Sequence, residues 1–385
     1  MSYRGGVTMP NPFEFTIPTK VIYKPGAVRE LGSLIAGMNV QKALLVTDQI
    51  LTEAGYAEQV EKILRSGGVA YQMFNEVEPN PSVETVEKGV ALFRDLDYQL
   101  VIALGGGSPI DVAKAVAVRV ANDQSTPSLE GLEQFKNDPL AVIAIPSTAG
   151  SGSEVTPFSV ITDRQKKYKF TIFSSRIIPR IAILDPGLIS SLPASVAAST
   201  GLDALTHAVE SYTSLLGSFY SDAFAEKAVD LIGKHLRRFV ASRENEEAAG
   251  AMLTAASFAG LAFAHGRLGI AHAMAHPLSA HFGVPHGVAN AILLPHVMEY
   301  NLTAVPEKFE RVSQLLGEKP AAENAISAIR KLNRDLGIAA SLSEVGVQSE
   351  AIEAMTADAM KSGNVPANPR LTGFSEIQAL YRQAM

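Results

Sequence analysis

The sequence predicts two domains: a parallel, doubly wound α/β domain followed by an all-helical domain. Three observations lead to this prediction. Short apolar runs alternate with helical segments in the first half, a glycine-rich stretch directly follows one of these runs, and strand-like runs vanish after Asp185. At 385 residues the chain is also long for a single core. We place the boundary near Pro193, which gives domains 1–193 and 194–385.

In the first half, the apolar runs and the turn residues between them mark the elements in order. Buried strands are predicted at 42–48, 69–74 and 99–104, with helices at 50–66, 81–95 and from about 109 between and after them. Further strands are predicted near 140–145, 158–162, 168–173 and 181–185. Strands that alternate with helices in this way form parallel sheets.

In the second half, alanine-rich segments with a period of about 3.6 residues predict helices throughout. The predicted helices are 194–213, 220–239, 246–264, 266–281, 288–300, 305–316 and 322–336.

Composition narrows the class of protein. Apolar residues make up 47% and charged residues 19% of the chain, as in a well-buried globular enzyme. The net charge of −6 without a long basic run argues against a nucleic-acid partner. The absence of cysteine excludes disulfides and thiolate ligands. Residues 1–10 lack the apolar core of a secretory signal and 251–264 is too short to span a bilayer, so we expect a cytoplasmic protein with no membrane partner.

Histidines gather in the helical half. Six of the eight lie between positions 265 and 296, and an Asp203-x-x-x-His207 pair precedes them. Side chains four apart on a helix point the same way, so Asp203 with His207 and His272 with His276 each offer two groups to one point. We expect His265 on the same face two turns before His272, and His286 to begin the next helix with its ring turned back toward that face. One carboxylate with several imidazoles indicates a divalent metal of the iron or zinc type, with a polar core or a proton-relay cluster as the alternatives.

Two loops of the first half are candidates for binding a cofactor. Gly105-Gly-Gly-Ser108 ends a strand and opens a helix, where free backbone N–H groups can hold a phosphate; a plain tight turn is the alternative. Asp48 ends the first predicted strand and could bind a ribose hydroxyl and disfavour a 2′-phosphate, or simply cap a helix. The hydroxyl-rich loop 146–154 could hold a pyrophosphate or nicotinamide, or be an ordinary surface loop.

These stretches together resemble the iron-containing (group III) alcohol dehydrogenase family, closest to its propanediol and lactaldehyde oxidoreductase branch. The resemblance runs in order from about position 15 to 384. The sequence motifs that carry it are Gly105-Gly-Gly-Ser-x-x-Asp111-x-x-Lys114, Ser147-Thr-Ala-Gly-Ser-Gly-Ser-Glu154, Gly201-Leu-Asp-Ala-Leu-Thr-His207-Ala-x-Glu210, His272-Ala-Met-Ala-His276-x10-Gly287, Asn290-Ala-Ile-Leu-Leu-Pro-His296 and Asn368-Pro-Arg370.

The resemblance implies a dinucleotide-binding α/β domain of Rossmann type, similar to dehydroquinate synthase, and an all-helical metal-binding domain. It implies NAD and a divalent metal as cofactors, with Fe²⁺ expected and Zn²⁺ possible, and a homodimer or larger homo-oligomer. The metal ligands would be Asp203, His207, His272 and His286. The NAD contacts would be Asp48, Asn80, Gly106, Gly107, Ser108, Ser147, Thr148 and Lys169.

The activity so implied is hydride transfer between NAD(H) and a small primary alcohol, diol or aldehyde, with the metal polarising the substrate oxygen. His276, beside the metal without ligating it, or His265 would relay the proton. Glycerol-type dehydrogenases and hydroxyacid–oxoacid transhydrogenases are alternatives within this class. A lyase resembling dehydroquinate synthase is the alternative from another class, but it would need basic residues that the apolar segment 273–275 and Phe158 do not supply. Phe158 and His265 depart from the residues common in relatives, so substrate identity should not be copied from any of them.

Overall fold

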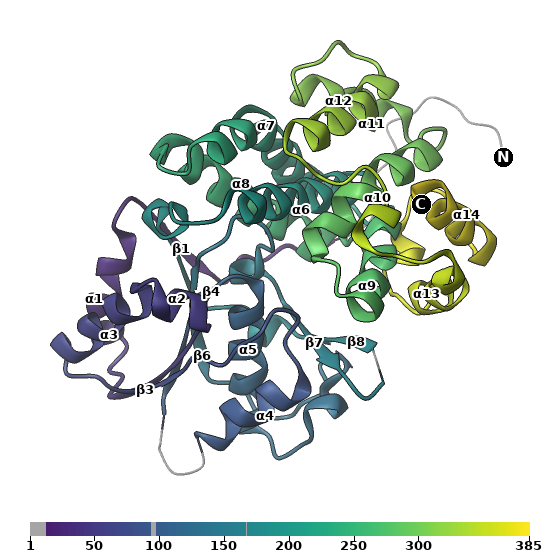
Figure 1. The fold of residues 1–385 in the computed structure, drawn as a ribbon. Coiled ribbons are helices and arrows are strands. Elements are labelled where there is room, and N and C mark those ends of the chain that lie inside the picture. Colours follow the sequence, from purple (N-terminus) through teal and green to yellow (C-terminus); the bar gives the residue numbers. More distant parts are fainter. Residues whose placement is uncertain (1–12, 94–97, 167) are drawn as a thin grey trace.

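A six-stranded parallel sheet forms the centre of the N-terminal half (Figure 1). The computed structural model describes residues 13–385, apart from 94–97 and 167. The strand order is β1-β9-β6-β4-β2-β3, and neighbouring strands run parallel. The strands are β1 Lys20–Tyr23, β2 Lys42–Val46, β3 Ala70–Phe74, β4 Leu100–Gly105, β6 Ala141–Pro146 and β9 Ile181–Leu184.

Helices cover both faces of this sheet, because the strands β2, β4 and β6 carry buried apolar residues on both sides. Leu45 packs with the side chains of α1 Leu31–Gly37 and α3 Tyr56–Ser66 on one face. Leu44 packs with those of α4 Val83–Ala91 and α5 Gly107–Ala121 on the other face. Strands buried on both faces in this way belong to a doubly wound fold.

A second, small sheet lies beside the main one. It consists of β5 Gly131–Leu132, β7 Phe158–Asp163 and β8 Tyr168–Phe173, with β7 and β8 antiparallel. Our prediction of strands at 158–162 and 168–173 is confirmed, but placing them in one parallel sheet is wrong, because the short connection between them closes a hairpin.

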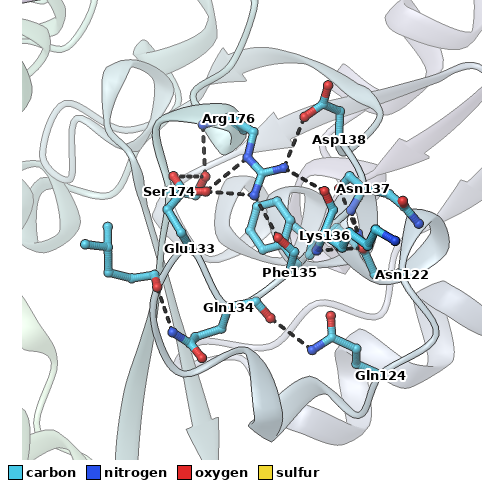
Figure 2. Close-up of polar contacts among 12 residues, drawn as sticks. Asn122, Gln124, Glu133, Gln134, Phe135, Lys136, Asn137, Asp138, Ser174 and Arg176 are labelled. Carbon is cyan, nitrogen blue, oxygen red and sulfur yellow. Dashed lines mark hydrogen bonds and ion pairs between the residues drawn. The ribbon is translucent and has the colours of Figure 1, made fainter.

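Arg176 holds the segment around β5 in place (Figure 2). Its guanidinium lies 4.2 Å from the ring centroid of Phe135 and donates to Glu133 Oε2 at 2.7 Å and to Asp138 Oδ1 at 3.1 Å. Nη2 also donates to the carbonyl of Phe135 at 2.8 Å. This arginine is therefore fully engaged in structural contacts.

From position 194 onward the regular elements are helices, some of them buried on nearly every side. They are α6 Ala194–Thr213, α7 Phe219–Ala241, α8 Glu246–Gly266, α9 Ile270–Phe282, α10 His286–Asn301, α11 Pro306–Leu315, α12 Ala322–Asp335, α13 Ile352–Ala359 and α14 Phe374–Ala384. Helices α6 and α8 lie at the centre of the molecule in Figure 1, next to the sheet. Of the described helices, α8 alone is long and apolar enough to cross a bilayer, but 72% of its apolar stretch is buried in the protein, as in a core helix.

Small residues let these helices approach one another closely. A Cβ on Gly201 of α6 would lie 2.3 Å from Leu236 Cδ1 of α7. A Cβ on Gly287 of α10 would lie 2.2 Å from the carbonyl oxygen of Ser199 on α6. The second approach brings the first residue of α10, His286, against α6.

The structure confirms the predicted α/β and all-helical fold classes and corrects several elements. Strand β1 was not predicted, and the helix expected at 50–66 is divided into α2 Gln49–Glu53 and α3 by Gly55, at a φ of 81°. The helix expected at 266–281 begins at Ile270, and His265 lies in the last turn of α8, which ends at Gly266. Our prediction that His265 shares a helix face with His272 is therefore wrong. The end of the helix expected at 81–95 lies outside the described residues. The same holds for residues 1–10, which we predicted to lack a secretory signal.

Candidate metal and cofactor site

Three buried side chains from two helices converge on one point. Asp203 and His207 on α6 and His272 on α9 each offer a ligand atom, and these atoms lie within 4.8 Å of one another. His286, the first residue of α10, completes the group, because its Nε2 lies 3.9 Å from Asp203 Oδ1. The structure thus brings the four predicted metal residues together, and we call these four residues the metal group.

A buried carboxylate orients one of these imidazoles. Oε2 of Glu210 lies 2.6 Å from Nδ1 of His272, and Oε1 accepts the backbone N–H of Ala271 at 2.6 Å. Nδ1 of His272 therefore carries the proton, and Nε2 keeps its lone pair for the centre of the group.

Asn290 lies on the other side of the same group. Its Nδ2 donates to Asp203 Oδ1 at 2.7 Å and lies 3.0 Å from His272 Nε2 and 3.2 Å from His286 Nε2. We assigned no role to Glu210 or Asn290 from the sequence. Both share helical spacing with a predicted ligand, seven residues after Asp203 and four after His286, and this spacing could have identified them.

Three imidazoles of the site, those of His207, His276 and His286, are held neutral by burial. Burial lowers the pKa of His207 to about 4 and that of His276 to about 3, and it also depresses the pKa of His286. The buried side-chain atoms without a hydrogen-bond partner among the described residues include Nδ1 of His286 and Oδ1 of Asn290 at this site. A neutral imidazole is the form that binds a metal, so one carboxylate with three imidazoles fits a divalent ion of the iron or zinc type.

The other predicted histidines fall into different places. The His276 ring stacks on the His286 ring at 5.3 Å, beside the metal group. The His265 ring instead packs on Phe15 at 4.1 Å, in contact with the N-terminal segment. His281 pairs with Asp358 at 2.8 Å.

The glycine-rich loop lies at the carboxyl end of β4, next to the place where the strand order changes direction. From β2 the chain proceeds outward to β3 on one side and to β4, β6 and β9 on the other, and ligands of such sheets bind at this point. Gly105 adopts a φ of 155°, and a Cβ there would lie 2.4 Å from Pro109 Cγ. A Cβ on Gly106 would lie 3.1 Å from Thr148 Oγ1, and one on Gly107 would lie 3.0 Å from Ser151.

This loop is arranged as a phosphate site requires. Gly107 and Ser108 begin α5, so their backbone N–H groups are free of the helix. Ser147, which follows β6, donates its backbone N–H to Gly105 at 2.9 Å and so brings the two predicted loops together. Bare backbone at this point fits a pyrophosphate.

Asp48 follows β2 on the other side of the same point. Its Oδ1 accepts the N–H of Leu51 at 2.9 Å, so it caps α2, and burial raises the pKa of its carboxyl. The capping alternative is therefore present in the structure.

Lys169 connects the cofactor side with the metal side. Its Nζ donates to Asn80 Oδ1 at 2.8 Å, and Asn80 has a positive φ of 55°. Burial lowers the pKa of Lys169 to about 8, against the opposing charges of Asp203 and Asp111, and its charge in turn lowers the pKa of His276. A cation thus lies near the metal group, although we had expected the apolar segment 273–275 and Phe158 to surround it without basic residues.

Lys114 and Asp111, from the glycine-rich motif, have a structural role that we did not predict. Lys114 is fully buried, and its Nζ donates to Ser153 Oγ at 2.9 Å and to the carbonyl of Phe158 at 2.8 Å. Asp111 accepts from Ser153 Oγ at 2.6 Å and from the N–H of Val160 at 3.0 Å. The motif therefore fixes the segment 153–160 between the two halves.

Aromatic rings extend from the metal group to an arginine. Phe263 stacks on His207 at 4.6 Å, and Phe158 stacks on Phe263 at 5.9 Å. Arg267 covers Phe158 at 5.6 Å and Phe173 at 4.5 Å. Its backbone has a φ of 66° and a ψ of 176°, a conformation that costs a non-glycine residue about 1–3 kcal/mol.

Sequence comparison decides the family. A model of iron-containing alcohol dehydrogenases matches residues 18–186, and a model of the C-terminal part of the Fe-containing alcohol dehydrogenase family matches 197–385. The chain belongs to the iron-containing alcohol dehydrogenase family. This confirms the predicted family and identifies the chain as an oxidoreductase of alcohols and aldehydes that uses NAD(H).

Relatives of this iron-containing alcohol dehydrogenase match it over nearly its whole length. The 1,3-propanediol dehydrogenase of Klebsiella pneumoniae is 39% identical over 100% of both chains. The lactaldehyde reductase of Escherichia coli K12 is 38% identical over 93% of this chain and 96% of its own.

Solved structures of the family share the fold. A crystal structure of 1,3-propanediol oxidoreductase superposes with a TM-score of 0.95 at 40% identity, covering 97% of this chain and 100% of its own. A sulfoacetaldehyde reductase from Bifidobacterium kashiwanohense, in complex with NAD⁺, superposes with a TM-score of 0.90 at 30% identity, covering 97% and 99%.

Proposed function

We propose that this enzyme transfers a hydride between NAD(H) and a small primary alcohol, diol or aldehyde, and that Asp203, His207, His272 and His286 hold its metal. The convergence of Asp203, His207 and His272 within 4.8 Å carries this proposal. Fe²⁺ is the metal that we expect, with Zn²⁺ as the alternative. When bound there, such an ion acts as a Lewis acid toward the substrate oxygen.

The residues of the chain would do the rest. Gly106 and Gly107 let the backbone approach the pyrophosphate, while Ser108, Ser147 and Thr148 line the same loops. Asp48 would hold the adenosine ribose, and Lys169 with Asn80 would bind on the side that faces the metal group. These placements align nicotinamide with the substrate carbon.

His276 would relay the proton of the alcohol. Burial lowers its pKa to about 3, so its imidazole is neutral at physiological pH and has a lone pair that can accept a proton. We withdraw His265 from this role, since its ring packs against Phe15.

The wider organisation follows the same proposal. We place the boundary of the two domains at Pro193, which lies between the two family matches, at 18–186 and 197–385. We also propose a homodimer or larger homo-oligomer in the cytoplasm.

The test is oxidation of NADH by the anaerobically purified, Fe²⁺-loaded enzyme with a panel of small aldehydes, neutral and anionic, that includes propanal and lactaldehyde. We expect turnover with free NADH. If the enzyme instead exchanges hydride between a hydroxyacid and an oxoacid without consuming free NADH, it is a transhydrogenase. If it does neither, the proposed activity is wrong.

A further inference from the structure

Arg267 occupies a backbone position suited to glycine. It directly follows α8 with a φ of 66° and a ψ of 176°, where a side chain is strained. Two glycines, Gly266 and Gly269, lie within two residues of it, so the chain has glycine nearby but carries an arginine at the strained position. Strain of this kind is retained at sites where the side chain has a function.

The guanidinium of Arg267 lies over two aromatic rings and keeps its donors free. Within residues 13–385, gaps at 94–97 and 167 aside, it makes no hydrogen bond or ion pair and contacts Phe158 and Phe173. Arg176 also stacks on a phenylalanine, but carboxylates and carbonyls occupy its donors (Figure 2). Arg267 therefore packs on aromatic rings as Arg176 does, but it lacks the carboxylate and carbonyl partners that Arg176 has.

The two arginines also differ in the charges around them. Burial lowers the pKa of Arg267, while the carboxylates of Glu133 and Asp138 raise the pKa of Arg176. A half-buried guanidinium that remains charged at all physiological pH values favours an anion as its partner.

The position of Arg267 connects it to the reaction. It lies four residues after Phe263, whose ring stacks on His207, and five residues before His272. Phe158, which Arg267 covers, packs on Phe263. The rings of Phe158, Phe263 and His207 thus form a continuous wall from the guanidinium to the metal group. Of these three rings Phe158 is half-buried, as is Phe173 beside it, while Phe263 and His207 are buried, so a ligand can reach this wall at the end where Arg267 lies.

We propose that Arg267 binds an anionic group at the far end of the substrate, and that the enzyme acts on small aldehydes or alcohols bearing a carboxylate, sulfonate or phosphoryl group. This inference rests on the proposed oxidoreductase function. A guanidinium donates two parallel hydrogen bonds to such oxyanions, and the half-buried ring of Phe158 beside it offers an apolar surface to the carbon chain that joins the anion to the reacting carbon.

The experiment compares acids with their neutral esters. The kcat/KM for NADH-dependent reduction is measured with succinic semialdehyde and glutaric semialdehyde and with the methyl ester of each. The wild-type enzyme is compared with Arg267→Gly, Arg267→Lys and the control Arg176→Lys. Glycine relieves the strained backbone, so Arg267→Gly should fold, and its thermal midpoint verifies this.

We expect the wild type to prefer one of the acids to its ester. In Arg267→Gly the ratio of kcat/KM between acid and ester should fall by about tenfold or more, as expected when a hydrogen bond to a charged group is lost. Arg267→Lys should keep part of the preference, and Arg176→Lys should keep all of it.

The outcomes separate the two proposals. If the esters are reduced but neither acid is preferred, or if acid and ester lose activity equally in Arg267→Gly, then Arg267 has only a packing role and this inference is wrong. If the wild type reduces neither acids nor esters, the proposed function fails as well.

Discussion

Nδ1 of His272 lies 2.6 Å from the carboxylate of Glu210, and this buried pair links α9 to α6 behind the metal group. The same carboxylate accepts the N–H of Ala271 at the start of α9. Because the pair fixes both the tautomer and the direction of the imidazole, Glu210 should control metal affinity without touching the ion.

The Glu210→Gln substitution tests this role. The amide keeps the shape of the side chain but loses its charge, so we expect the affinity for Fe²⁺ or Zn²⁺ to fall by about 10–100-fold in competition with a chelator. Glu299→Gln, which removes an exposed partner of Arg330, is the control and should leave the affinity unchanged. Equal affinity in Glu210→Gln and the wild type would show that His272 does not need this partner.

Gly287 determines how closely α10 approaches α6. The Cβ of Gly287→Ala would lie 2.2 Å from the carbonyl of Ser199, so α10 must move and carry His286 away from Asp203. We expect a loss of about 1–3 kcal/mol in the free energy of unfolding and weaker metal binding. The control is Gly363→Ala, whose Cβ would have no heavy atom within 4 Å. If Gly287→Ala has the same free energy of unfolding as the wild type, the close approach of α10 to α6 does not contribute to stability and this prediction is wrong.

Asp48 should discriminate between NADH and NADPH. Asp48→Ser keeps a hydroxyl that can cap α2 and removes the charge. Like charges a few Å apart repel by about 1–4 kcal/mol, so the ratio of kcat/KM for NADPH over that for NADH should rise by about tenfold or more. An unchanged ratio would leave Asp48 with the capping role alone.

The buried ammonium of Lys114 should be essential for stability. Replacing it with methionine leaves the buried carboxylates of Asp111 and Glu154 without its charge. We expect Lys114→Met to lower the free energy of unfolding by about 3–5 kcal/mol in urea titration. Lys62→Met, which removes an exposed partner of Glu58, should change it by about 0.5 kcal/mol or less. Comparable stability in both variants would contradict the structural role of Lys114.

Periodicity predicted most helices and strands correctly because burial imposes it locally. Strand β1 has mostly exposed side chains and pairs with β9 far along the chain, so no local pattern marks it. Strands β7 and β8 are antiparallel, and their apolar pattern does not reveal this direction either.

In the candidate site too, local spacing predicted some contacts, while others depend on tertiary packing. Asp203 and His207 share one helix, so spacing alone predicted that they lie together. Our prediction for His265 was wrong because α8 ends at Gly266, one residue after it. The next residue, Arg267, ends the helix with a backbone conformation suited to glycine, and an arginine in the sequence does not predict such a conformation. Glu210 meets His272 through tertiary packing between α6 and α9.

The central claim is that Asp203, His207, His272 and His286 hold one catalytic metal. It is tested most directly by the metal content of anaerobically purified protein, measured for the wild type and for His272→Ala and His286→Ala, with His281→Ala as the control. We predict about one divalent ion per chain in the wild type and in His281→Ala, and loss of both the ion and the NADH-dependent activity in the other two variants. Full metal content with full activity in His272→Ala or His286→Ala would contradict the claim.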